Sequence, residues 1–213
     1  MFHIEKNFIT EEERLAVKQT VHDLKEHWDN FENVTPNGAN VYSVLGNALY
    51  LMEAQGQVPS QINWQVQEIL VEHFNWLHQR ICSKVADLTF CNTQLHPTLT
   101  VPGFHIGAVP GNYHVNRYHN DCSILSYDAS GEHKETNYSV LIPIEIPATG
   151  ACLAYLDNAE EKKLPYELGG FYQWKATLDH KIGDFSLAPG EHRISLQCHY
   201  YYNREQDTNY VYF

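Results

Sequence analysis

The feature that most constrains the fold is a change of sequence pattern at about His96. From there on, short runs of β-branched and aromatic residues follow one another, separated by Pro-Gly, Ala-Thr-Gly and Gly-Gly turns. The runs are LTVPGFHIGAV (99–109), YSVLIPIEIP (138–147), ACLAYLD (151–157), FYQWKATLDHKI (171–182) and HRISLQCHYYYN (192–203). Several strands at this spacing predict a β-sandwich or a double-sheet jelly roll, so this half of the chain should form a mainly β core.

The N-terminal part has the pattern of helices instead. Thr10 followed by the acidic residues 11–13 is typical of a helix N-cap with an acidic first turn. Apolar residues then recur with a period close to 3.6 as far as Trp28, and they do so again from about Gln61 to Val85. The intervening stretch NVTPNGANVYSVLG (33–46) is rich in turn formers and is expected to be a loop.

Together these patterns predict an α+β fold with a mainly β core. We expect a single domain over residues 1–213, with a helical part over about 1–90 and a jelly-roll core over about 95–213. The helices should pack on one sheet of that core, which has the form of a double-stranded β-helix like that of the cupins.

Charge and cysteine usage restrict the setting in which the protein works. The formal net charge is −12, from 26 acidic and 14 basic residues, and there is no basic tract. Nucleic acid and anionic membranes are therefore disfavoured as partners on electrostatic grounds. No apolar run is long enough for a signal peptide or a membrane span. The five cysteines are dispersed without CxxC spacing, which favours free thiols and a cytoplasmic location.

The chemistry is concentrated in a few polar residues of the β-rich half. His119 and Asp121 are two positions apart, so on a strand both side chains share a face and could reach one cation. A third ligand could come from His180, in the run 171–182. Arg193 and Ser195 again share a face, and a guanidinium beside a hydroxyl is suited to binding a carboxylate. Two histidines and one carboxylate form the facial triad of non-heme Fe(II) oxygenases.

In their order and background, these residues resemble the iron(II)- and 2-oxoglutarate-dependent oxygenases. The resemblance covers roughly residues 100–202 and rests on His119-x-Asp121, the later His180 and Arg193-x-Ser195. It implies that the first three bind Fe(II) and that Arg193 and Ser195 hold the distal carboxylate of 2-oxoglutarate. The implied reaction uses O2, converts 2-oxoglutarate to succinate and CO2, and hydroxylates an unactivated C–H bond. The carboxylate of Asp121 favours a hydroxylase over a related halogenase.

A second assignment of the distal ligand is open on the sequence alone. The gap from His180 to Arg193 is longer than is usual in this family, and the turn APGE can absorb the excess. The rival uses His192 as the ligand and Arg204 as the carboxylate-binding residue. Arg204 has no hydroxyl two residues later, so His180 is preferred.

Other residues are weaker candidates for the pocket. Asn116 could reach the cosubstrate, and Arg117, His105 or Tyr113 could meet a polar substrate, although each could equally be an ordinary sheet or loop residue. Trp174 is more often a core residue than a substrate platform. The polar stretch 127–137 is either a lid or a surface loop.

Three functions follow as hypotheses. The first is an oxygenase that hydroxylates a small molecule, such as an amino acid or a natural-product intermediate. The second is an oxygenase of the same kind acting on a protein side chain. The third is a jelly-roll module that binds a metal or a sugar without redox chemistry, and Arg193 with Ser195 speaks against it, because such a module needs no carboxylate clamp.

Overall fold

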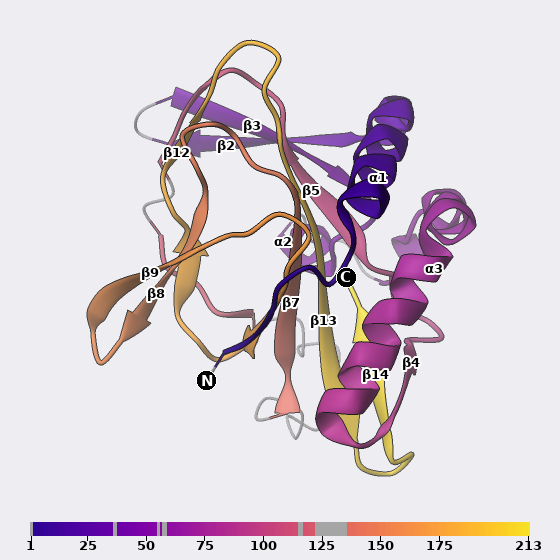
Figure 1. Cartoon of the computed structure of the whole chain (residues 1–213). Helices are drawn as coiled ribbons and strands as arrows, with labels where there is room; N and C mark the ends of the chain where they lie inside the picture. Colours follow the sequence, from indigo (N-terminus) through magenta and orange to yellow (C-terminus); the bar gives the residue numbers. More distant parts are fainter. Residues whose placement is uncertain (1, 36–37, 55, 57–58, 115–116, 122–135) are drawn as a thin grey trace.

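The computed structural model describes residues 2–35, 38–54, 56, 59–114, 117–121 and 136–213 (Figure 1). The helices are α1 (Glu11–Asp23), α2 (Leu49–Ala54) and α3 (Trp64–Thr89), with short 3-10 turns η1 (Lys25–His27) and η2 (Pro59–Gln61). The strands are β1 (His3–Glu5), β2 (Asp29–Thr35), β3 (Gly38–Leu45), β4 (Asn92–Leu95), β5 (Gly103–Gly107), β6 (Gly111–Tyr113), β7 (Tyr138–Glu145), β8 (Cys152–Asp157), β9 (Glu160–Pro165), β10 (Phe171–Lys175), β11 (His180–Ile182), β12 (Phe185–Leu187), β13 (Arg193–Asn203) and β14 (Thr208–Tyr212). No described helix is long and apolar enough to cross a membrane.

The largest sheet is built around β13. It has nine strands in the order β1-β10-β7-β13-β5-β3-β2, with β14 also paired to β13 and β4 paired in parallel to β14. Because β13 is eleven residues long, it pairs along one side with β7 and along the other with β5 and then β14. The other described strands form two smaller sheets, β11-β8-β9 and β12-β6. In Figure 1, β8, β9 and β12 lie on the side of β13 opposite to α1 and α3. The predicted jelly-roll fold, with helices on one sheet, is confirmed.

Alternation along β13 separates the core from the site. Ile194, Leu196 and Cys198 are fully buried and belong to the same hydrophobic cluster as Leu70 and Phe74 of α3. Successive side chains of a strand point to opposite faces. The residues that alternate with these three along β13 therefore project into the space that separates the large sheet from the small ones. The polar side chains on that inner face are Arg193, Ser195, Gln197 and His199.

Local interactions fix α1 where it begins and then tie it to the rest of the molecule. The predicted N-cap is confirmed as a capping box, in which Glu13 N–H donates to Oγ1 of Thr10 (3.2 Å) and Thr10 N–H donates to Oε2 of Glu13 (2.8 Å). Glu13 also pairs with Arg80 of α3 at 2.7 Å, and the pKa of this carboxyl is lowered to about 2, chiefly by Arg80. Arg14 donates to the carbonyl oxygen of Ile144 at 2.6 Å, which anchors the helix to the end of β7.

Two expectations about secondary structure are wrong. The stretch 33–46, expected to be a loop, lies mostly in the antiparallel pair β2–β3, so the part before residue 90 is not purely helical. The Val and Tyr residues that end this stretch pair with β5, and this long-range pairing outweighs the turn formers before them. The run 171–182 is also divided into β10 and β11, which belong to different sheets, because the chain turns between residues 176 and 179.

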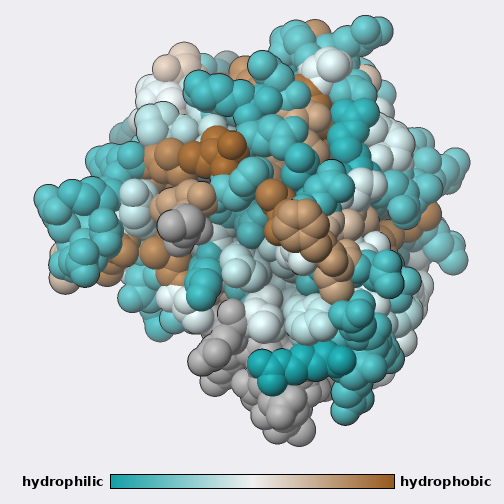
Figure 2. Space-filling view, turned by 60° about the horizontal axis from the view of Figure 1, so that its bottom comes forward, coloured by the Kyte–Doolittle hydropathy of each residue, from teal (hydrophilic) through white to brown (hydrophobic). Residues whose placement is uncertain are grey.

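The surface fits the acidic, polar composition. On the face shown in Figure 2, hydrophilic side chains predominate and hydrophobic ones form scattered small patches. This pattern is usual for a protein whose charge keeps it dispersed in water.

Candidate active site

The three residues predicted as metal ligands are brought together by a turn and a single β-bridge. His119 and His180 pair through their backbones, with His119 N–H donating to the His180 carbonyl (3.0 Å) and His180 N–H donating to the His119 carbonyl (2.8 Å). Asp121 N–H donates to the carbonyl of Ala176 in the turn that follows β10, at 2.8 Å. The expected strand under His119 and Asp121 is therefore reduced to this one bridge.

The side chains of this triad converge. Nε2 of His180 lies 3.4 Å from Oδ2 of Asp121, and Nε2 of His119 lies 3.8 Å from Oδ1 of the same carboxylate. All three ligand atoms lie within 4.8 Å of one another. Bonds of about 2.1 Å to one ion would place such atoms roughly 3.0–3.4 Å apart, so small side-chain movements suffice to close the site on a cation.

The pKa values of the triad residues favour the binding of a cation. Burial alone would raise the pKa of Asp121, but His180, His199 and His119 together hold this pKa below its usual value. The pKa of His119 is lowered by burial and by the nearby His180. An ionised carboxylate is the form in which Asp121 can bind a divalent metal. Nδ1 of His180 also lies 2.9 Å from the Leu178 carbonyl, so this nitrogen carries the proton and Nε2 is free to bind.

The triad is open on one side. Asp121 and His180 have side chains only 8% and 5% exposed, whereas that of His119 is 51% exposed. Trp174, itself buried, packs its ring edge-on against His180 with centroids 5.1 Å apart. Trp174 is thus a core residue that packs against the candidate ligand His180, and the more common interpretation of its sequence context is the correct one.

Two residues that the sequence did not single out hold the carboxylate. The Ser139 hydroxyl on β7 donates to Oδ2 of Asp121 and lies 3.2 Å from Nδ1 of His199 on β13. Ser139 and His199 are paired across the two strands, and both are almost fully buried. Nothing in the sequence marks either residue, because each is positioned only by strand register.

Removing this support should weaken metal binding. We expect Ser139→Ala to lower the affinity for Fe(II) by about 10–100-fold, since a hydrogen-bonding partner of a ligand typically contributes that much. Anaerobic titration of Fe(II) into the purified protein measures the change. Ser43→Ala is the matched control, because Ser43 is also buried and hydrogen-bonded, in its case to Asn30 at 2.7 Å. Equal Fe(II) affinities in the two variants would show that Ser139 does not support the metal site.

Arg193 and Ser195 lie on the inner face of β13, where they are paired with Gly107 and His105 of β5. Both are buried, with 4% and 2% of their surfaces exposed. Nevertheless Nε of Arg193 and Oγ of Ser195 have no hydrogen-bond partner within the described part of the chain. Burial lowers the pKa of Arg193 from its ordinary value, and no described carboxylate lies within ion-pair distance of its guanidinium. A buried cation without an anion is costly, and a carboxylate supplied by a ligand would remove that cost.

Tyr166 completes this group, and the sequence did not reveal it. Its buried hydroxyl has no hydrogen-bond partner of ordinary geometry among the described residues, and it lies close enough to the guanidinium of Arg193 for each group to act on the pKa of the other. On another side the guanidinium carbon lies 5.8 Å from the ring centroid of Phe185. Arg193, Ser195 and Tyr166 thus present unsatisfied polar groups of the kind that a carboxylate accepts bonds from.

The weaker pocket candidates have different outcomes. His105 lies on the inner face, where its Nδ1 is 2.7 Å from Oε1 of Gln197 and its Nε2 is 2.9 Å from the Tyr50 hydroxyl. Burial and the nearby Arg193 lower the pKa of His105 to about 3, so the ring is neutral. Tyr113 is stacked on Phe185 and donates to the Val109 carbonyl at 2.7 Å, as a structural residue of β6 does.

The remaining candidates are exposed, lie outside the described residues, or belong to another part of the molecule. Arg117 is exposed, two residues before His119. Asn116 and most of the stretch 127–137 lie outside the described residues. The rival ligand His192 groups with His22 and Glu145, away from the triad, and Arg204 is exposed in the turn between β13 and β14.

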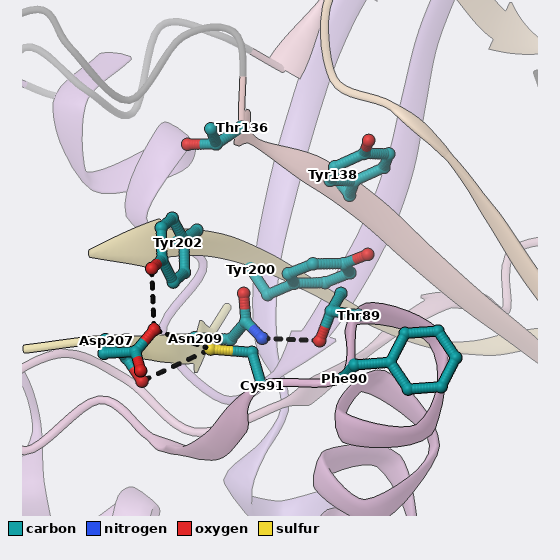
Figure 3. A pocket seen from close by; sticks show the side chains of 9 residues that line it. All are labelled: Thr89, Phe90, Cys91, Thr136, Tyr138, Tyr200, Tyr202, Asp207 and Asn209. Atoms are coloured by element: carbon teal, nitrogen blue, oxygen red, sulfur yellow. Dashed lines mark hydrogen bonds between the residues drawn. The ribbon is translucent and has the colours of Figure 1, made fainter. Parts of the chain in front are cut away.

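A pocket of about 330 Å³ lies elsewhere, on the helix-facing side of β13 (Figure 3). Its lining includes Tyr138 and Tyr200, whose rings stack with centroids 5.1 Å apart, and Asp207, which accepts a hydrogen bond from Tyr202 at 2.7 Å. Tyr200 and Tyr202 point away from the face that carries His199. This pocket is therefore separate from the triad.

Comparison with known proteins bears on the fold. No protein-family model matches the sequence, and a search of curated proteins finds no match. Solved structures do match. The non-heme alpha-ketoglutarate-dependent epimerase SnoN from nogalamycin biosynthesis superposes with a TM-score of 0.57 at 12% identity, covering 94% of this chain and 79% of that one. A 2OG-Fe(II) oxygenase family oxidoreductase from Burkholderia pseudomallei gives 0.58 at 9% identity, covering 92% and 83%.

A third structure is a prolyl hydroxylase from Trichoplax adhaerens, in complex with a peptide fragment of the oxygen degradation domain of hypoxia inducible factor. It gives a TM-score of 0.50 at 13% identity, covering 97% of this chain and 85% of that one. At identities this low the likeness speaks for architecture alone. The chain therefore shares its fold with these enzymes, and that fold is the double-stranded β-helix.

Proposed function

We propose that this protein is an Fe(II)- and 2-oxoglutarate-dependent oxygenase. His119, Asp121 and His180 would hold the iron, and Arg193 with Ser195 would bind the distal carboxylate of 2-oxoglutarate. The observation that carries the proposal is the buried guanidinium of Arg193, which has no described anionic partner and stands beside the unsatisfied Ser195 hydroxyl. The convergent triad and the fold shared with such oxygenases support it.

The side chains present fit both Fe(II) and 2-oxoglutarate. Two imidazoles and one ionised carboxylate are the donor set of the facial triad, which leaves coordination positions open. When bound, iron with 2-oxoglutarate and O2 supplies the oxidising chemistry, in which 2-oxoglutarate becomes succinate and CO2 while a substrate C–H bond is oxidised. The protein binds, orients and shields these reactants, as it does in cofactor enzymes generally.

Each side chain has a definite task in this scheme. Arg193, together with Ser195 and Tyr166, fixes the far end of the cosubstrate, so that its other end is directed at the triad. Ser139 and His180 Nδ1 keep the metal-binding atoms of the triad oriented through the hydrogen bonds described above. The exposed side of His119 is the route by which a substrate can reach the centre.

For the substrate we propose a small molecule that is hydroxylated on an unactivated carbon. The likeness to SnoN, an epimerase of nogalamycin biosynthesis, supports this class. The likeness to a prolyl hydroxylase in complex with a peptide fragment keeps a protein side chain as the alternative. The buried Arg193 and Ser195 argue against a binding module without redox chemistry, because such a module gains nothing from an unpaired buried cation.

Turnover of the cosubstrate tests the function. Purified protein supplied with Fe(II), 2-oxoglutarate and O2 is expected to form succinate slowly even without a substrate, and faster with one. A panel of amino acids, small natural products and proline-containing peptides then separates the two substrate classes by which members accelerate succinate formation. Tight zinc binding together with no binding of 2-oxoglutarate would identify a binding module instead.

A further inference from the structure

A second cluster of two histidines and one carboxylate lies on the helix side of the large sheet. His22 is in the last turn of α1, Glu145 ends β7, and His192 immediately precedes β13. One potential ligand atom from each residue lies within 4.8 Å of the others, as in the candidate iron triad. Nε2 of His22 is 3.4 Å from Oε2 of Glu145, and the two imidazole rings meet edge to face with centroids 4.6 Å apart.

This cluster is built into the fold and does not belong to loosely held surface chains. The side chains of His22 and Glu145 are 24% and 17% exposed, and His192 is also partly buried. Lys18 holds the other carboxylate oxygen of Glu145 at 2.7 Å, so the carboxylate is oriented with Oε2 directed at His22.

The cluster is distinct from the active site. Ser139 and His199, which contact Asp121, lie on β7 and β13, and Glu145 and His192 lie toward the other end of the same strand pair. The six steps along the strand from Ser139 to Glu145 span about 20 Å at roughly 3.3 Å per residue. A cation at the second cluster therefore shares no ligand with the first.

We propose that His22, Glu145 and His192 form a second metal site, which takes a divalent transition-metal cation of the zinc type. Two imidazole nitrogens and one carboxylate oxygen are a zinc donor set, with water as the fourth ligand. Closing the site requires the ligand atoms to approach to about 3.4 Å, the separation in a tetrahedral zinc centre with bonds of about 2.1 Å, and the His22–Glu145 pair is already at that separation. The cation would join α1, β7 and the turn before β13.

The surrounding charges set the expected strength of the site. Arg14, Lys18 and Lys25 are the positively charged side chains near the cluster, and Lys18 is in direct contact with the carboxylate. These charges oppose a bound cation, so affinity should be moderate in the wild-type protein. Lys18→Met removes the nearest opposing charge and should therefore tighten zinc binding.

The test uses the full-length chain with the active-site triad disabled by Asp121→Ala and His180→Ala. Titration calorimetry with Zn²⁺ is expected to find one zinc per chain in this background. Adding His192→Ala, or separately Glu145→Gln, should weaken binding by at least about tenfold, because losing even an outer partner of a metal ligand has an effect of that size. Adding Lys18→Met should strengthen binding. His73→Ala is the matched control, since His73 is an exposed histidine on α3 outside both clusters.

Thermal unfolding of the otherwise wild-type protein gives a second measurement, which is independent of the triad variants. Zinc in excess of that needed to fill the triad should raise Tm in the wild type and in His73→Ala, and should raise it less in His192→Ala, because binding to the folded state stabilises it. No zinc bound in the triad-disabled background, or equal effects of His192→Ala and His73→Ala in both measurements, would overturn the proposal. Neither measurement depends on oxygenase activity, so failure of this site and failure of the proposed function are distinguishable.

Discussion

The Asp121→Ala variant is expected to lose succinate formation entirely and to bind Fe(II) at least about 100-fold more weakly. Asp121 is the only carboxylate of the triad, and its pKa is held low so that it remains charged next to His119 and His180. Without it, only two imidazoles are left to bind the metal, so the loss of affinity should exceed the 10–100-fold effect of removing a hydrogen-bonding partner of a ligand. Anaerobic Fe(II) titration and a succinate assay measure the two effects.

A matched aspartate controls for the loss of charge. Asp184→Ala removes a carboxylate that lies 3.3 Å from the imidazole of His114 at the surface, where its side chain is 59% exposed. This variant should bind Fe(II) and turn over as the wild type does. Circular dichroism of Asp121→Ala should show an intact β core, since the residue lies outside the hydrophobic clusters. Wild-type turnover in a folded Asp121→Ala protein would exclude this residue as a ligand.

The Arg193→Lys variant should bind 2-oxoglutarate about ten- to a hundred-fold more weakly, although the charge is kept. Lysine loses the planar, two-pronged donor that matches a carboxylate, and a charge-assisted contact contributes roughly 1.5–3 kcal/mol. Ser195→Ala should weaken binding less, because a neutral hydroxyl contributes about 0.5–1.5 kcal/mol. Titration of 2-oxoglutarate into the anaerobic Fe(II)-loaded protein, followed by the metal-to-ligand absorption band, gives both affinities.

Stability separates a binding role for Arg193 from a purely structural one. Arg193→Met removes a buried, unpaired cation, so the ligand-free protein should be as stable as the wild type or more stable, while 2-oxoglutarate no longer raises its Tm. Arg204→Lys is the control, because Arg204 is exposed beyond the end of β13 and was the rival carboxylate-binding residue. Unchanged 2-oxoglutarate affinity in both Arg193→Lys and Arg193→Met would show that Arg193 does not bind the cosubstrate, and this would contradict the main argument for the proposed function.

Much of the fold is readable from the sequence because it depends on interactions between near neighbours. The capping box at Thr10 needs only Glu13 three residues later, and α3 follows from the apolar period that buries Leu70 and Phe74. Alternation along 193–203 likewise assigns one face to the core and one to the site, and Ile194, Leu196 and Cys198 on the core face are fully buried. The local sequence of the stretch 33–46 predicts a loop, whereas its strand is stabilised by pairing with β5, about sixty residues away.

By itself, the sequence pointed to His119, Asp121, His180, Arg193 and Ser195, because their residue types and order carry chemistry that spacing can reveal. Only the tertiary structure decided that the first three converge and that Arg193 is buried without a described counter-ion. It also supplied Ser139, Tyr166 and the cluster of His22, Glu145 and His192. These residues come from separate elements and have no local pattern, so strand register and helix packing alone bring them together.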